Sequence, residues 1–225
     1  MSLLIPNHHP INPDGLVLWL DYKNTGSVAA TGTWKDYSGN GNDGTLVGDA
    51  YVDNGGLDLD GAGDYVDVGN GYGYTSSSIS QWVYLRSIPP VSTTFGIGVD
   101  NSDLDRWGII VRSSNNKFTI FNDIDNLNLD YTGTTTVNTG QWYHLVAVIN
   151  GSSHKLYVNG ALDASGTTPK TWADLNSQSA YVGALPVGSP VPGLAFNGKI
   201  DEVMIFNRAL SVGEIQTMYQ RTLRA

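Results

Sequence analysis

The amino-acid sequence predicts an all-β protein, an antiparallel β-sandwich with one short C-terminal helix. Three observations lead to this fold class. Glycine makes up 27 of the 225 residues, charged residues make up only 15%, and short apolar runs alternate with turn residues along the chain. A chain of this length can bury a large core, and a single sandwich can reach this size.

The strands are predicted from apolar runs that are bounded by Gly, Asn, Ser or Pro. The pair Asn159-Gly160 predicts a tight hairpin turn, because both positions of such a turn need a positive φ. A second turn is predicted at 150–153, before the strand 155–158 that leads into Asn159-Gly160. The predicted strands lie at 16–20, 57–59, 65–68, 79–85, 95–99, 107–111, 118–121, 141–149, 155–158, 181–183 and 198–206.

One helix is predicted near the C-terminus. Ser211 is a good N-cap, and Glu214 three residues later completes a capping box. Leu210 and Ile215 have the spacing of a hydrophobic staple. Ile215, Met218 and Tyr219 form a short apolar stripe, so we expect the helix to seal the sandwich.

Two parts are expected along the chain. Residues 1–14 form a Pro-rich arm, and residues 15–225 form one sandwich domain. We expect the arm to pack on its own domain or on a neighbouring subunit, because termini are ordered only when they are tied down. His8 and His9 are adjacent on an extended chain and point to opposite sides, so they predict no metal site.

Composition excludes several classes of function. The formal net charge is −9 with no local basic patch, so no binding to nucleic acid is expected. No apolar run approaches ~18 residues, so no membrane insertion is expected. The absence of cysteine excludes disulfides, thiolate metal sites and cysteine nucleophiles. The first residues lack the basic and apolar regions of a signal peptide.

Six segments along the chain form an ordered set of motifs: DYSGNGNDG at 36–44, LDGAGDYV at 59–66, ISQWV at 79–83, QWYHLVA at 141–147, LYVNG at 156–160, and GKIDEV to NRALS within 198–211. In this order they resemble the laminin-G-like and concanavalin A-like jelly rolls. The resemblance covers roughly residues 15–222, and it implies a jelly-roll sandwich that hosts many different functions.

The resemblance implies a structural Ca²⁺ near the Ser-Gly-Asn-Gly-Asn loop. Ca²⁺ takes hard oxygen ligands, and the residues that can supply them are Asp36, Asn40, Asn42 and Asp201. Asp21 and Asp43 are weaker candidates. The alternative is an Asx-rich loop whose side chains bond their own backbone.

Aromatic residues outside the predicted core are candidates for a sugar site, because the C–H faces of sugars stack on aromatic rings. Trp107, Trp172, Tyr72 and Tyr74 are predicted to lie in or beside loops and to bind a glycan. Their alternative role is to cover one end of the core or a subunit interface. The remaining strand tryptophans, Trp19, Trp82 and Trp142, are predicted to fill the core.

The sequence offers no matched catalytic set. Asp201 and Glu202 are adjacent on a strand and point to opposite faces, so they do not form the carboxyl pair of a glycosidase. A G-x-S-x-G motif is absent. We read the acidic stretches 100–105 and 123–130 as solvated loops, and His144 as a hydrogen-bonded core residue.

Two functions remain open after these exclusions, and neither is enzymatic. The first is a glycan-binding or adhesion module, exposed outside the cell or on a virion surface. The second is a structural or decoration protein of a phage capsid or tail, with residues 1–14 contacting other subunits. The two roles are compatible, since a virion surface protein can also adhere to glycans.

Overall fold

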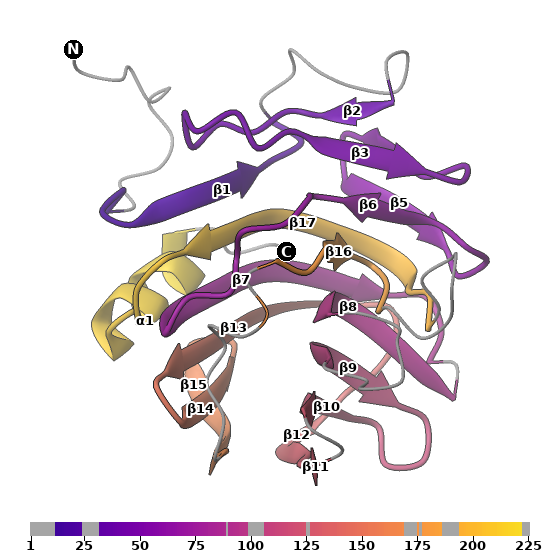
Figure 1. Ribbon diagram of the computed structural model, residues 1–225. Coiled ribbons are helices and arrows are strands. Elements are labelled where there is room, and N and C mark those ends of the chain that lie inside the picture. The colour runs from indigo at the N-terminus through magenta and orange to yellow at the C-terminus, as the bar shows by residue number, and fades with distance from the viewer. Residues whose placement is uncertain are drawn as a thin grey trace.

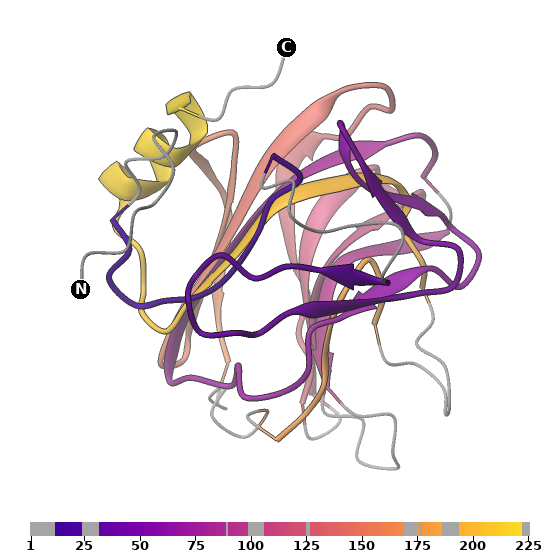
Figure 2. The same ribbon diagram turned by 90° about the horizontal axis from the view of Figure 1, so that it is seen from above.

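A computed structural model shows two antiparallel sheets packed face to face, which confirms the predicted sandwich (Figure 1). The structure describes residues 12–23, 32–88, 90–98, 106–124, 127–168, 175, 177–185 and 194–221. Seen from above, the C-terminal helix lies outside the sandwich, against one of the two sheets (Figure 2).

The eight-stranded sheet has the order β15-β14-β13-β7-β17-β5-β4, with β1 paired to β17. The hairpins and the long closing strand agree with the sequence prediction. Its strands are β1 (Leu16–Leu20), β4 (Tyr51–Asp53), β5 (Gly56–Asp60), β7 (Ser76–Leu85), β13 (Trp142–Asn150), β14 (Ser153–Val158), β15 (Ala161–Thr167) and β17 (Asn197–Phe206).

The nine-stranded sheet has the order β11-β10-β9-β8-β16-β6-β3-β2, with β12 paired to β10. Sequence analysis missed β2, β3, β11 and β12 of this sheet, and β4 and β15 of the other, because short or polar runs carry no clear apolar alternation. The stretch 123–130, interpreted as a solvated loop, contains the end of β10 and all of β11. The strands are β2 (Thr33–Trp34), β3 (Gly44–Val47), β6 (Tyr65–Asp67), β8 (Val91–Gly98), β9 (Arg106–Arg112), β10 (Lys117–Ile124), β11 (Leu127–Asn128), β12 (Tyr131–Thr136) and β16 (Ala180–Val182).

The main core lies between the two sheets and is filled by every second residue of most strands. Ile79 and Val83 face it from β7, and Phe95 and Ile109 face it from the opposite sheet. Each of these side chains is fully buried. Residues between them in sequence therefore face outward, and two outer surfaces remain for other roles.

The C-terminal helix, α1 (Val212–Arg221), has the predicted capping box. Ser211 Oγ accepts from the Glu214 backbone N–H at 3.3 Å, and Glu214 Oε2 accepts from the Ser211 N–H at 2.8 Å. Arg208 also donates to both Glu214 oxygens. The hydrogen bond with Arg208 lowers the pKa of Glu214 to about 2, against the opposing effect of burial.

Within the described chain, no helix combines the length and apolar character that a membrane crossing requires.

The helix packs on the outer face of the eight-stranded sheet. Ile215 and Met218 enter an apolar cluster on that face. Further along α1, Tyr219 stacks on Trp82 at 5.9 Å and on His144 at 6.1 Å between ring centroids. The helix thus seals the part of the face formed by the middle of β7 and β13, as predicted.

Candidate functional site

Five residues lie directly opposite one another across five neighbouring strands of the eight-stranded sheet. In order they are Trp142 on β13, Tyr84 on β7, Lys199 on β17, Asp58 on β5 and Tyr51 on β4. We call this set the five-strand row. Four strand spacings separate its ends, so the row spans ~19 Å across the sheet.

Strand alternation turns the five-strand row outward. Each member is followed or preceded by a residue that is buried in the main core. These core neighbours are Tyr143, Val83, Ile200, Leu57 and Val52, in the order of the row. Successive side chains of a strand point to opposite faces, so all five members of the row lie on the outer face.

Aromatic rings occupy both ends of the five-strand row. Trp142 and Tyr84 have ring centroids 5.6 Å apart with planes inclined at 53°, and both are partly exposed. Tyr51 at the other end is 47% exposed, although large apolar side chains of this protein are mostly buried. Exposed aromatic carbon of this kind is the usual platform for a ligand with a flat apolar face.

Charged groups fill the middle of the five-strand row. Lys199 Nζ donates to both carboxylate oxygens of Asp53, at 2.8 and 2.6 Å. Asp58 accepts from the Arg86 guanidinium and lies 3.5 Å from Lys199 Nζ. Burial raises the pKa of Asp53, but the Lys199 and Gly55 hydrogen bonds outweigh it and lower the pKa overall. The hydrogen bond from Arg86 to Asp58 raises the pKa of Arg86.

This ion-paired network holds its donors and acceptors in fixed positions. Asp58 is only 7% exposed, while Arg86 and Asp53 reach the surface. A ligand with hydroxyl groups can therefore bond to oriented polar atoms between two aromatic platforms. Such preorganised groups lose little conformational entropy when a ligand binds.

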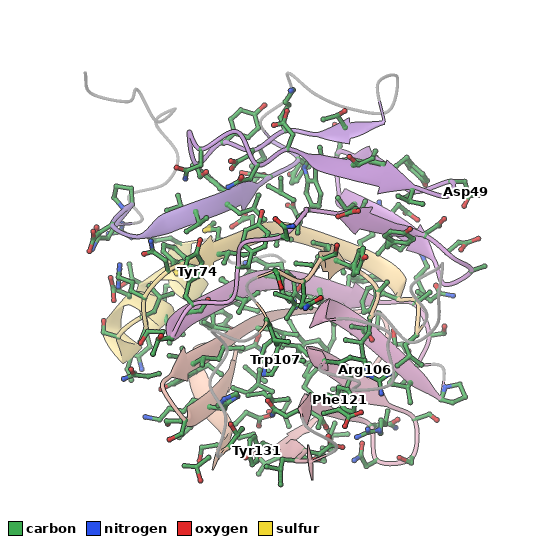
Figure 3. All side chains as sticks on the ribbon, viewed as in Figure 1. Asp49, Tyr74, Arg106, Trp107, Phe121 and Tyr131 are labelled. Atoms are coloured by element: carbon green, nitrogen blue, oxygen red, sulfur yellow. The ribbon has the colours of Figure 1, made fainter. Side chains whose placement is uncertain are left out.

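A cluster of three carboxylates adjoins the Tyr51 end of the row. Asp49 precedes Tyr51 by two residues, and Asp60 follows Asp58 by two residues. Ligand oxygens of Asp49, Asp60 and Asp64 all lie within 4.8 Å of one another, so they can hold a metal ion. Figure 3 shows Asp49 at the edge of the molecule, beside the end of β3.

The turns around this cluster orient the buried member, Asp64. Its two oxygens accept from the Asp49 N–H at 3.0 Å and the Asp60 N–H at 3.1 Å. Gly48 has a positive φ, and a Cβ there would lie 2.3 Å from Asp64 Oδ1, so only glycine fits. Burial raises the pKa of Asp64, and the side chain of Asp49 and the charge of Asp60 add to this rise. The two backbone N–H donors act in the opposite direction and only partly offset it.

The loop at 36–44 uses its polar side chains on its own backbone. Asp36 Oδ1 accepts from the Trp19 N–H at 2.9 Å, and Oδ2 accepts from the Asn42 N–H at 2.9 Å. Asn40 and Asn42 donate to the Val17 carbonyl at 3.1 and 2.9 Å. Of the two predicted roles, the Asx-rich turn accounts for these hydrogen bonds.

Asp201 lies apart from that loop. It is fully buried, and its Oδ1 accepts from the Tyr22 N–H at 3.1 Å, beyond the end of β1. Asn40 and Asn42 bond at Val17, near the start of β1 and ~10 Å before its last residue, Leu20. The structure therefore does not bring Asp201 into one ligand set with Asn40 and Asn42. Asp43 is paired with Lys35, and Asp21 Oδ1 accepts from the Lys23 N–H at 2.9 Å.

Two of the aromatic residues predicted to bind a glycan are buried. Trp107 lies on β9 between the sheets with no exposed surface, and its indole N–H donates to His154 Nδ1 at 3.3 Å (Figure 3). Tyr72 is 2% exposed and donates to the Val68 carbonyl at 2.8 Å. Their alternative role in the core is the one observed. Tyr74 is half-buried, and Trp172 lies outside the described residues.

The prediction for Trp142 was wrong in the opposite direction, from buried to exposed. It was expected to fill the core, but it is partly exposed on the outer face. The signal was present in the sequence: Tyr143 and Leu145 alternate inward, so Trp142 and His144 must point outward. Alternation alone could not show that α1 covers His144 and does not bury Trp142.

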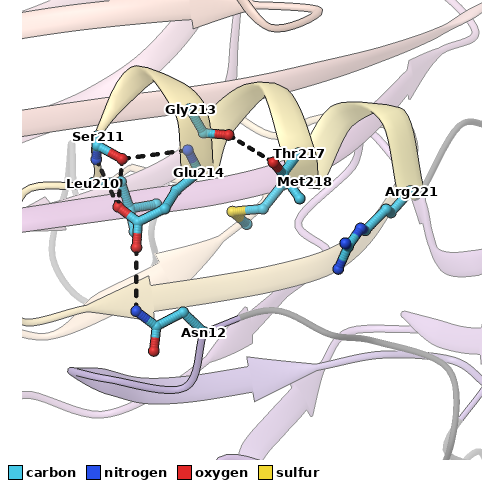
Figure 4. Close-up of a pocket in the computed structure, with 8 residues that line it drawn as sticks. All are labelled: Asn12, Leu210, Ser211, Gly213, Glu214, Thr217, Met218 and Arg221. Carbon is cyan, nitrogen blue, oxygen red and sulfur yellow. Dashed lines mark hydrogen bonds between the residues drawn. The ribbon is translucent and has the colours of Figure 1, made fainter.

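A pocket of about 470 Å³ lies along α1 on the same outer face (Figure 4). Asn12 contributes to its wall and donates to Glu214 at 3.4 Å. Leu210 and Met218 give it apolar surface, and polar groups of α1 form its rim. The lining residues are Asn12, Leu210, Ser211, Gly213, Glu214, Thr217, Met218 and Arg221.

Comparison with solved structures identifies sandwich domains of carbohydrate-active proteins and of a toxin. Domain 4 of the extracellular arabinanase AbnA from Geobacillus stearothermophilus, solved with arabinotriose, has a TM-score of 0.64 and 22% identity. The match covers 91% of this chain and 98% of that domain. Trypanosoma rangeli sialidase has a TM-score of 0.68 and 20% identity, and the match covers 91% of this chain but 32% of the sialidase.

The receptor-binding domain of botulinum neurotoxin C/D mosaic serotype gives a TM-score of 0.69 and 20% identity. That match covers 94% of this chain and 52% of the toxin domain. At these identities the likeness shows the fold. No curated protein sequence matches the chain. A family model described as the concanavalin A-like lectin/glucanase superfamily matches residues 60–216, which is more than half of the chain, and the protein belongs to this superfamily.

Proposed function

We propose that this protein is a non-catalytic module that binds glycan through the five-strand row. The observation that carries the proposal is the register of the row, which places exposed rings at both ends of a fixed polar centre. Sugar rings present apolar C–H faces to aromatic side chains and hydroxyl groups to carboxylates and ammonium groups. A row of ~19 Å is long enough for several linked sugar units.

The comparisons support a binding role more than a catalytic one. The arabinanase match spans nearly the whole of one separate domain, and that domain was solved with arabinotriose. The sialidase match spans only about a third of the enzyme, so its activity is not carried over to this chain. A sandwich that binds glycan would act where glycans are displayed, outside the cell or on the surface of a virion.

The test is a glycan array of neutral and sialylated oligosaccharides, followed by calorimetry with the best binder. Trp142→Ala and Tyr51→Ala are each expected to weaken binding by about 1–3 kcal/mol, or about 5- to 150-fold, on the scale of stacking on aromatic rings. Leu162→Ala is the control, because Leu162 is 55% exposed on β15, which carries no member of the row. Full affinity in both aromatic variants would refute the row as the site.

The carboxylate cluster is proposed to hold a structural Ca²⁺. Its donors are hard oxygens, and a bound cation would compensate the burial and the neighbouring charge that raise the pKa of Asp64. The ion would join the turns at 48–49 and 60–64, beside the Tyr51 end of the row. We expect Ca²⁺ to raise the melting temperature of the wild type and of Asn40→Ala, but not of Asp60→Asn. A rise retained by Asp60→Asn but lost in Asn40→Ala would favour the loop at 36–44.

A second candidate function is assembly through residues 1–14. The observation that favours it is the fixed end of this arm, where Arg208 Nε donates to the Asp14 carbonyl at 2.8 Å beside the α1 pocket. A capsid or tail subunit could use such an arm. Light scattering of the full chain and of a variant without residues 1–11 tests this role. A monomer in both would contradict self-assembly through the arm.

A further inference from the structure

A second set of aromatic and acidic side chains lies on the other outer face of the sandwich. On β6, Val66 is buried in the core, so Tyr65 and Asp67 point outward. On β16, Ala180 and Val182 are buried, so Tyr181 points outward as well. Tyr181 lies directly opposite Asp67 in the pairing of β16 with β6.

The rings of Tyr65 and Tyr181 meet at a right angle on this face, and we call these two residues together with Asp67 the corner. Their ring centroids are 5.4 Å apart and their planes are inclined at 89°. Both rings are partly exposed, and neither packs in one of the three apolar clusters of the described residues. A sugar can therefore lie on one ring with its edge toward the other.

The electrostatics of the corner select the class of ligand. Asp67 Oδ1 accepts from the Gly69 N–H at 2.8 Å, which orients the carboxylate beside the rings. The neighbouring strands β3 and β8 carry no Lys or Arg. The nearest cations in the strand order are Lys35 beside β2 and Arg106 on β9, and they are paired with Asp43 and Asp123. Burial raises the pKa of Tyr65, and the nearby Tyr181 and Asp67 raise it further. The Asp67 carboxylate beside the rings makes the local electrostatic potential negative. Such a corner favours hydroxyl donors and repels carboxylated or sulfated sugars.

We infer that Tyr65, Tyr181 and Asp67 form a second binding site, for a neutral sugar, so that one chain can bridge two glycan strands. The inference rests on the proposed function of the five-strand row, but it is carried by a different sheet. The row lies on the outer face of the eight-stranded sheet, and the corner lies on the outer face of the nine-stranded sheet. The sandwich core separates the two sites, so one short ligand cannot occupy both.

Calorimetry with neutral trisaccharides, beginning with arabinotriose, and with sialyllactose tests the inference on the full chain. We expect two neutral trisaccharides per chain, one in Tyr181→Ala, one in Trp142→Ala, and no binding of sialyllactose at the corner. Tyr65→Ala is a second variant on another strand, and its melting temperature checks the fold. Leu162→Ala again serves as the control.

Cross-linking provides a second measurement. Monomeric wild-type protein should precipitate a long neutral polysaccharide, whereas each single-site variant should bind it without precipitation. One trisaccharide per wild-type chain, unchanged in Tyr181→Ala but abolished by Trp142→Ala, would overturn the second site and leave the row intact. Binding of sialyllactose at the corner would overturn its assignment to neutral sugars. Absence of any sugar binding would refute both the proposed function and this inference.

Discussion

Two aromatic pairs on the outer face of the eight-stranded sheet differ in burial. Trp82 and His144 lie under α1 and are 2% and 1% exposed. Two residues away on the same strands and the same face, Tyr84 and Trp142 are partly exposed. The sequence pattern is the same at both ends, so coverage by the helix determines which aromatic pair becomes core and which remains available to a ligand.

This contrast separates stability from binding. Aromatic rings at the α1 end contribute buried apolar area and a three-ring stack with Tyr219. Rings of the five-strand row contribute little burial and remain open at the surface. Substitutions at the α1 end should therefore lower stability, whereas substitutions in the five-strand row should weaken binding. Four measurements test this difference.

The largest expected effect is on stability at the α1 end. Trp82→Ala should lower the free energy of unfolding by about 3–5 kcal/mol, because it leaves a cavity beneath the helix. Trp142→Ala should lower it by less than about 1 kcal/mol. Urea unfolding measures both variants. Equal losses would show that Trp142 is a core residue, as the sequence first suggested.

The second effect is pH dependence at the same end. Burial lowers the pKa of His144 to about 3, well below its ordinary value of 6.5. The unfolded chain therefore binds the proton first, and His144 alone lowers the free energy of unfolding by about 2 kcal/mol as the pH drops from about 6.5 to 5. His144→Gln should be less stable at pH 7 but should depend less on pH. An equally steep decline in this variant would exclude His144 as the cause.

The third effect concerns the cap that holds α1 in place. Ser211→Ala removes the hydroxyl that accepts from the Glu214 N–H and should cost about 1 kcal/mol of unfolding free energy. Val212→Ala is the matched control, since Val212 is 49% exposed. Chemical denaturation compares the two. Glycan affinity should be unchanged in both, and a large loss in Ser211→Ala would link the helix to the binding site.

Local rules predicted much of the fold. The capping box at Ser211 and Glu214 and the hairpin at Asn159-Gly160 depend on neighbouring residues, and these predictions were confirmed. The five-strand row depends on the register of strands that are distant in sequence. Tyr51 and Trp142 are 91 positions apart, and no local pattern relates them.

The candidate site was harder to predict for two physical reasons. Trp107 is preceded by an acidic stretch, so it resembled a loop residue, but β9 lies in the middle of its sheet and buries it completely. Asp36, Asn40 and Asn42 have ligand chemistry, but the same oxygens and amides satisfy the backbone around β1. Residue type indicated the kind of chemistry, while only the pairing of strands determined its place.

The most direct test of the central claim follows the indole N–H signals by NMR during titration with a bound oligosaccharide. The chain has six tryptophans, and Trp142→Phe assigns the signal of interest by its disappearance. We expect the Trp142 signal to shift with ligand, while the signals of buried Trp82 and Trp107 stay in place. A Trp142 signal that stays fixed while glycan binds would refute binding at the five-strand row and place the glycan site elsewhere.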